Sequence, residues 1–194
     1  MGLKILKKEN LFNRIISKLW LKDAYRKIER IEKFLNKEGK ILDIGGGLGT
    51  VSYLLKKKGY DSKVIDVQDV SIFKDIQPLI YDGIKIPFND NIFDIALILT
   101  VLHHTKSPEI ILNEAKRVAK RIIIIEDIYN SLLQKYLTFL IDSFANFQFF
   151  NHPHSNKNHN EWIRLFKNLN LEVIEYRIIK TAPFVHQVTY LLKT

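Results

Sequence analysis

Residues 41–50, with the sequence ILDIGGGLGT, join a short apolar run to a turn that contains four glycines. Glycine adopts positive φ and carries no Cβ, so the main chain can turn sharply here and a ligand can approach it closely. A helix that begins near Thr50 would direct its first backbone N–H groups at such a ligand. The stretch therefore predicts a strand–turn–helix unit with a bound group at the turn.

Short runs rich in isoleucine and valine alternate with helical stretches after residue 40. The expected strands are KILDI, KVIDV, PLIYD, FDIALIL and RIIIIED, and the expected helices are TVSYLLKKKG, EIILNEAKRVAK and NEWIRLFKNLN. This alternation predicts βαβ units around a parallel sheet. LEVIEYRIIK and FVHQVTYLLK follow each other without a helix, which predicts an antiparallel hairpin at the sheet edge. We therefore expect an α/β, Rossmann-like doubly wound sheet, mostly parallel with an antiparallel last strand, and helices on both faces.

The composition limits the classes of function that the chain can have. Its 194 residues, 46% of them hydrophobic, are enough for one domain with a sizeable core. The absence of cysteine excludes disulfides, thiolate metal sites and cysteine nucleophiles. No apolar run is long enough to span a bilayer or to resemble a secretory signal, so we expect a soluble, cytoplasmic protein. The net charge of +9 favours an anionic partner, although a lysine-rich composition gives the same excess.

Two acidic residues define the chemistry around the glycine turn. The spacing Asp43-x-Gly45-x-Gly47-x-Gly49 is a GxGxG pattern, and Thr50 stands where the GxGxxG pattern of dinucleotide-binding folds requires its last glycine. Asp66 closes the next expected strand, about twenty residues beyond the turn, where a carboxylate can bind both hydroxyls of a ribose. The combination predicts a nucleoside ligand without naming it.

A third block separates the alternatives. Residues 81–104 read YDGIKIPFNDNIFDIALILTVLHH, which places Asp82 at the end of the third expected strand. Together with the glycine turn, this order resembles the class I S-adenosylmethionine-dependent methyltransferases, and within them the broad small-molecule group of methyltransferase type 11. The resemblance covers roughly residues 38–180. It is specific for the cofactor, S-adenosyl-L-methionine, and unspecific for the acceptor. A nicotinamide-dependent oxidoreductase is disfavoured by Thr50 and by the Asp82 block.

The resemblance implies a cofactor site built from strand ends. Asp43 would hold the methionine end, Asp66 would bind the ribose hydroxyls, and Asp82 would meet the adenine together with the backbone of Gly83. A carboxylate can accept a bond from the amino group of adenine, and the ammonium of the cofactor favours an anionic neighbour. Asp94 is interpreted as a turn residue outside the site. The implied cofactor-binding set, without a metal ion, is Asp43, Gly45, Gly46, Gly47, Gly49, Asp66, Val67, Asp82, Gly83 and Thr100.

Histidines supply the candidate bases for catalysis, because histidine titrates near neutral pH. They cluster after the expected fourth and fifth strands, on the side of an open α/β sheet where ligands bind. The candidate catalytic residues are His104, His154 and His159. Three alternatives stay open: His104 bonds neighbouring backbone and only positions the pocket, the loop NHPHSNKNHNEW is solvated, or its HxH spacing binds a metal.

Residues 1–37 are interpreted as an N-terminal helical segment of the same domain, which continues as the methyltransferase domain over 38–194. Residues 10–37 have apolar side chains at helical spacing. In folds of the resembled family such a helix commonly covers the pocket, so we expect a lid. Its basic face and Trp20 also fit peripheral contact with a membrane surface.

The acceptor is expected to be small, and aromatic or lipophilic. The insertion over residues 127–158 is rich in aromatic side chains, and long segments at this position typically border a ligand; a packing role for these rings fits equally well. Nucleic acid is disfavoured because the Pro-Pro-aromatic pattern of amine-methylating enzymes is absent after the fourth strand. An inactive cofactor-binding module and an RNA or protein methyltransferase remain as alternatives, and the oligomeric state is left open. The aromatic residues are Tyr129, Tyr136, Phe139, Phe144, Phe147, Phe149 and Phe150.

Overall fold

A single mixed sheet organises the chain in the computed structural model, which describes residues 11–131, 134, 136, 155–182 and 185–194. Over these residues the sheet has seven strands in the order β3-β2-β1-β4-β5-β7-β6. The strands are β1 (Lys40–Ile44), β2 (Asp61–Asp66), β3 (Leu79–Ile80), β4 (Ile95–Leu99), β5 (Arg121–Ile128), β6 (Glu172–Ala182) and β7 (Val185–Lys193).

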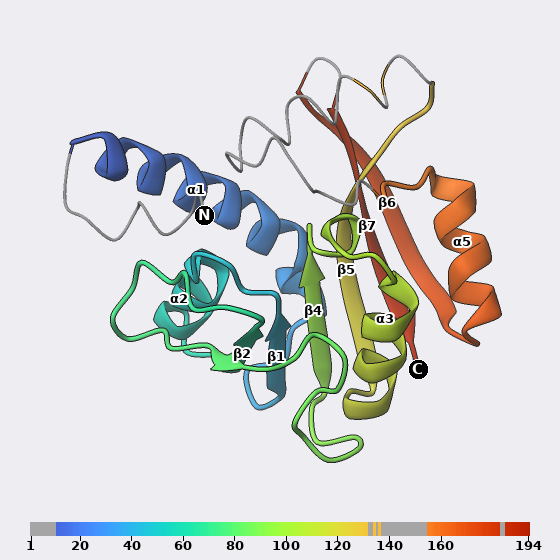
Figure 1. Ribbon diagram of the computed structural model, residues 1–194, viewed down its shortest axis with the longest axis horizontal. Helices are drawn as coiled ribbons and strands as arrows, with labels where there is room; N and C mark the ends of the chain where they lie inside the picture. The colour runs from blue at the N-terminus through green and yellow to red at the C-terminus, as the bar shows by residue number, and fades with distance from the viewer. Residues whose placement is uncertain (1–10, 132–133, 135, 137–154, 183–184) are drawn as a thin grey trace.

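Helices cover both faces of the sheet, as Figure 1 shows. On one face, α1 (Leu11–Ile31) and α2 (Thr50–Lys57) enclose a core with one set of strand side chains. On the other face, α3 (Pro108–Val118) and α5 (His159–Asn168) enclose a second core that contains Trp162 and Phe166. Two short 3₁₀ helices, η2 (Glu32–Phe34) and η3 (Leu102–His104), follow α1 and β4.

The strand directions confirm the expected fold class. β1 to β5 pair in parallel, whereas β7 runs antiparallel to both β5 and β6. All five residues of β4 are buried, because a central parallel strand is covered on both faces. Since the carboxyl ends of parallel strands share one edge, the segments after β1, β2, β4 and β5 meet there. We call this edge the carboxyl edge.

The N-terminal helix is shorter than the expected 10–37. It ends at Ile31 and continues as η2, after which the chain turns into β1. Ala24, Ile28 and Ile31 are buried against the sheet, so the chain must reverse soon after them to begin β1 at Lys40. Among the described residues, no helix is both long enough and apolar enough to cross a membrane. The division at residue 37 and the role of α1 as a lid stay predictions.

Candidate functional site

The glycine turn lies at the carboxyl edge between β1 and α2. The backbone N–H groups of Gly45 and Gly46 both donate to the carbonyl of Ile65 at the end of β2, at 2.9 and 3.3 Å. Helix α2 begins at Thr50, and its N-cap residue, Gly49, provides no side-chain hydrogen bond. Backbone donors at a helix start with no side-chain cap suit a ligand with oxygen acceptors.

Two of the glycines show what the turn requires. Gly45 has φ +72°, and a Cβ added to it would lie 2.7 Å from Cγ1 of Val101, so the turn packs directly on the segment after β4. Gly47 has φ +53°, but a Cβ there would meet no protein atom within 4 Å. Gly47 therefore faces open space. Packing within the protein does not require a glycine here, whereas a ligand that approaches the main chain would.

Asp66 joins the turn to the end of β2. Its Oδ2 accepts a hydrogen bond from the Gly47 N–H at 2.9 Å, and its Oδ1 accepts one from the Gln68 N–H at 3.2 Å. Asp66 is 9% exposed. Each carboxylate oxygen has a second lone pair, so the group can still accept bonds from ribose hydroxyls.

Asp43 lies on β1, two residues before the turn, and is buried at 2% exposure. Its Oδ2 accepts a hydrogen bond from the Ser52 hydroxyl of α2 at 2.6 Å. Burial raises the pKa of Asp43 to about 6; the Ser52 bond and the charge of Lys27 oppose this rise, and Asp66 adds to it. At neutral pH the carboxylate is ionised but poorly compensated. A cationic ligand above it would be stabilised.

The β3 side of the edge provides an apolar surface of the kind that an adenine ring can pack against. Val67 and Ile84 are 56% and 61% exposed, and a Cβ at Gly83 would lie 3.1 Å from Cγ1 of Val67. Asp82 is exposed, and its Oδ1 accepts bonds from the N–H groups of Ile84 and Lys85, which lower its pKa. Gly83 packs beside Val67, and the role of Val67, Asp82 and Gly83 in binding adenine stays a prediction.

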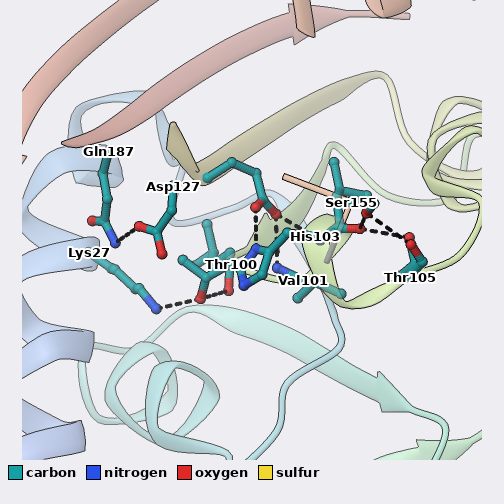
Figure 2. Close-up of polar contacts among 11 residues, drawn as sticks. Lys27, Thr100, Val101, His103, Thr105, Asp127, Ser155 and Gln187 are labelled. Atoms are coloured by element: carbon teal, nitrogen blue, oxygen red, sulfur yellow. Dashed lines mark hydrogen bonds and ion pairs between the residues drawn. The ribbon is translucent and has the colours of Figure 1, made fainter. Parts of the chain in front are cut away.

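Thr100 marks the β4 end of the site. It has φ +60°, and its N–H donates to the Ile125 carbonyl at 2.6 Å. Its Oγ1 accepts a hydrogen bond from the Lys27 ammonium of α1 at 2.8 Å, as Figure 2 shows. Lys27 is buried, at 6% exposure, and was missed by the sequence interpretation. The signal was present, because Lys27 lies on the same helix face as Ala24, Ile28 and Ile31.

A buried Glu–His contact holds the segment after β4. Glu126 Oε1 accepts from the N–H groups of Val101 and Leu102, at 2.9 and 2.7 Å, and Glu126 Oε2 lies 2.5 Å from His103 Nδ1. Both side chains are almost fully buried. His104, the candidate base, is half-buried, and its ring centroid lies 4.0 Å from that of His103. Glu126 therefore fixes the backbone that carries both Thr100 and His104.

A chain of hydrogen bonds links α1 to the end of β5. Arg30 Nη1 donates to Gln187 Oε1, and Gln187 Nε2 donates to Asp127 Oδ1, each at 2.8 Å. Asp127 is half-buried at the end of β5, and burial raises its pKa. Figure 2 places Asp127 and Gln187 beside Lys27 and Thr100. The strand-end rule that located Asp43 and Asp66 would also have found Asp127.

The remaining histidine predictions have different outcomes. His159 lies at the start of α5, where its Nδ1 is 2.9 Å from the Tyr190 hydroxyl and its ring packs against Tyr176. Burial lowers the pKa of His159. His154 lies outside the described residues, as do Phe139, Phe144, Phe147, Phe149 and Phe150. In the described part of the chain, no cluster of His, Asp or Glu side chains could hold a metal ion.

Comparison with known proteins gives the family. A family model described as a methyltransferase domain matches residues 12–176, which is most of the chain. The chain belongs to the class I S-adenosylmethionine-dependent methyltransferases. An uncharacterized protein of Methanocaldococcus jannaschii is 33% identical over 99 residues, which cover 48% of this chain and 45% of that relative. The match thus spans less than half the length of the relative.

Solved methyltransferases share the fold of this domain. An S-adenosylmethionine-dependent methyltransferase of Methanosarcina mazei has a TM-score of 0.67 at 18% identity, covering 84% of this chain and 96% of its own. Magnesium protoporphyrin IX methyltransferase of Synechocystis, with S-adenosylhomocysteine bound, has a TM-score of 0.65 at 13% identity, covering 96% and 89%. At such identities the likeness shows the fold alone.

The residues at the carboxyl edge fit S-adenosylmethionine, the cofactor of the family. Gly47 leaves the main chain open to a ligand, Asp66 offers acceptors for a ribose, and Asp43 offers an anion for a cationic methionine end. When bound, the cofactor supplies a sulfonium methyl group for in-line displacement. The domain's own contribution to such a reaction would be positioning and the exclusion of water, because the reaction requires no covalent protein group.

Proposed function

We propose that the protein transfers the methyl group of S-adenosylmethionine to a small acceptor with an aromatic or lipophilic body. The observation that carries this proposal is the anchoring of the aromatic insertion at both of its ends. At the start, the Tyr129 hydroxyl donates to Glu161 Oε2 at 3.0 Å. At the end, Ser155 Oγ donates to the carbonyls of Leu102 and Thr105 at 3.1 and 2.9 Å.

The Ser155 anchor lies against the segment after β4 that carries His104, and the Tyr129–Glu161 anchor lines the same pocket as Ser155. The Ser155 N–H also donates to the His103 carbonyl at 3.2 Å, so the end of the insertion lies in contact with η3 (Figure 2). A segment rich in aromatic residues whose end lies against η3, next to the expected cofactor site, supports an apolar or planar acceptor. The net charge of +9 is the feature that supports the alternative, an RNA or protein acceptor on the basic surface.

A methyl-transfer assay with tritium-labelled S-adenosylmethionine tests the proposal. The acceptor panel contains phenols, aromatic amines, fatty acids and prenyl alcohols, with bulk RNA and unfolded protein in separate reactions. We expect the tritiated methyl group to appear in one of the small apolar acceptor classes. Phe147→Ala or Phe150→Ala should then raise KM for that acceptor more than they lower kcat, because they remove contact area.

Three results would contradict this assignment in different ways. Label only in RNA or protein would replace the acceptor class. Cofactor binding without transfer to any acceptor would favour the inactive binding module. Failure to bind S-adenosylhomocysteine at all would contradict the cofactor site itself.

A further inference from the structure

Lys27 is a buried cation at the methionine side of the site. At 6% exposure, it is the one buried lysine or arginine among the residues whose side chains the structure describes. An ammonium has three N–H donors. Described partners account for two of them, Thr100 Oγ1 at 2.8 Å and Asp23 Oδ2 at 2.9 Å. A buried ammonium that keeps one donor is suited to an anionic ligand.

The position of Lys27 links it to the glycine turn. Thr100, which Lys27 contacts, precedes Val101, and the Val101 side chain packs on Gly45. Lys27 also acts electrostatically on Asp43 and on Asp127. The ammonium therefore lies at the junction of β1, β4 and α1, as the close-up of Figure 2 shows for its Thr100 side. Arg30, one turn further along α1, points instead to Gln187.

The charges of the ligand and of this junction are complementary. The methionine end of S-adenosylmethionine carries two cations, the sulfonium and the ammonium, and one carboxylate. Ile41 on β1 and Ile125 on β5 belong to the core under α1 and α2, so Asp43 and Asp127, two residues further along these strands, lie on the same face and provide anions. Lys27 provides the buried cation. An anion placed near Asp43 without Lys27 would be repelled in this poorly solvated setting. Among the side chains that the structure describes, Lys27 is the buried cation available to the carboxylate.

We propose that the Lys27 ammonium binds the carboxylate of the cofactor's methionine end, and so makes the site select the intact amino acid over decarboxylated forms. The inference rests on S-adenosylmethionine being the cofactor. It assigns α1 a direct role in ligand selection, beyond covering the pocket. It also separates two ligand classes that share the nucleoside and the ammonium and differ in one carboxylate.

Two soluble probes test the proposal without an acceptor. The dissociation constants of S-adenosylhomocysteine and of its decarboxylated analogue, S-adenosyl-3-thiopropylamine, are measured by titration calorimetry at pH 7.5. A charge-assisted hydrogen bond predicts that the wild-type protein binds S-adenosylhomocysteine at least roughly tenfold more tightly. In Lys27→Met the two probes should bind within about twofold of each other.

Arg26→Met is the matched control, because Arg26 is an exposed cation on the same helix. It removes the same formal charge and should keep the wild-type ratio between the probes. Lys27→Arg should also keep most of the preference, since a guanidinium retains the charge. Asp23, the ion-pair partner of Lys27, is 40% exposed, so water can solvate it when Lys27 is replaced. Circular dichroism checks that each variant is folded.

The ratio between the probes decides the result. A preference that persists in a folded Lys27→Met protein contradicts the role of Lys27 and leaves it a structural partner of Asp23 and Thr100. If the wild-type protein binds the two probes with nearly equal dissociation constants, the role of Lys27 is contradicted as well. This result does not depend on whether any variant folds. If the wild-type protein binds neither probe, both the cofactor assignment and this inference are wrong.

Discussion

The two halves of the carboxyl edge are built by different means. In the β1–β3 half, the groups that we expect to face the ligand are main-chain atoms of the glycine turn and carboxylates at strand ends, Asp43, Asp66 and Asp82. In the β4–β7 half, the polar groups are placed by contacts between distant segments, such as Lys27 with Thr100 and Gln187 with Asp127. The first half is local in sequence, and the second depends on the assembled fold.

This difference predicts a division of labour. The β1–β3 half suits a constant ligand, because backbone geometry and a strand-end carboxylate recognise features that every S-adenosylmethionine molecule has. The β4–β7 half contacts α1, η3 and the two ends of the insertion. Because these segments differ from the glycine turn in having side chains at their contacts, we expect this half to determine which acceptor is methylated. Substitutions in the first half should therefore abolish cofactor binding, whereas those in the second should change turnover or selectivity.

The largest expected effect is that of Gly47→Val. Gly47 has φ +53° and open space where a Cβ would be, so the new side chain would occupy the ligand's position. We expect no measurable binding of S-adenosylhomocysteine in calorimetry. Gly59→Val is the matched control, because Gly59 also has positive φ, +78°, with no protein atom within 4 Å, but lies beyond the end of α2.

Both variants should lose a similar amount of stability, at least about 1–2 kcal/mol, because a branched residue is placed at positive φ. Thermal unfolding measures this loss. Equal binding by the two variants would show that the turn does not contact the cofactor, and the comparison between the halves would lose its basis.

His104→Ala tests the other half. If His104 is the base, turnover with an acceptor from the panel should fall by roughly 10²-fold or more, because general-base catalysis contributes about 10²- to 10⁴-fold. The dissociation constant of S-adenosylhomocysteine should stay within a few fold. His159→Ala provides the contrast: His159 contacts the buried Tyr190 hydroxyl, so we expect a lower unfolding temperature.

Unchanged turnover in His104→Ala would leave His104 as a residue that only positions the segment after β4. A steep loss of turnover in a stably folded His159→Ala protein would reverse the assignment. His154 stays a prediction that the same assay covers.

Asp66→Ala should weaken S-adenosylhomocysteine binding at least roughly tenfold. The substitution removes the acceptors for two ribose hydroxyls and the bond that holds the Gly47 N–H. Asp61→Ala, at the opposite end of β2, removes an exposed carboxylate of the same strand and should bind normally. Equal affinity in the two variants would mean that β2 does not contribute the ribose carboxylate.

The smallest effect is a pH dependence that comes from Asp43. Its pKa is raised to about 6 in the folded protein, from 3.8, because the carboxyl is buried. A cationic methionine end requires the ionised form, so cofactor affinity should rise severalfold between pH 5 and pH 7. The unfolding free energy should change in the opposite direction, since the folded state binds the proton more tightly.

The stabilisation from protonated Asp43 is complete below pH 3.8 and is lost as the pH rises through about 6, with a magnitude of about 2–3 kcal/mol. Asp43→Asn should remove the affinity trend and weaken the stability trend, to which the raised pKa of Asp127 also contributes, as calorimetry and urea unfolding at matched pH values would show. A wild-type affinity that is flat between pH 5 and pH 7 would place the ammonium away from Asp43.

The same contrast explains what the sequence could predict. The glycine turn, Asp66 and the all-apolar strand β4 could be predicted because spacing and alternation are local properties; the strand order β3-β2-β1-β4-β5-β7-β6 was not predicted, because it depends on pairing between distant segments. Glu126 could not be assigned, because its role depends on the approach of residues 101–103 more than twenty positions away. Lys27 and Asp127 left a signal: a charge on an apolar helix face and a carboxylate at a strand end.

Calorimetric titration of the wild-type protein with S-adenosylhomocysteine and, separately, with NAD tests the central claim most directly. Both ligands contain an adenine nucleoside, but only the first has the amino-acid end that the junction of β1, β4 and α1 fits. The account predicts that S-adenosylhomocysteine binds with one molecule per chain and that NAD does not bind measurably. A protein that binds NAD but not S-adenosylhomocysteine, or that binds neither ligand, would contradict this prediction.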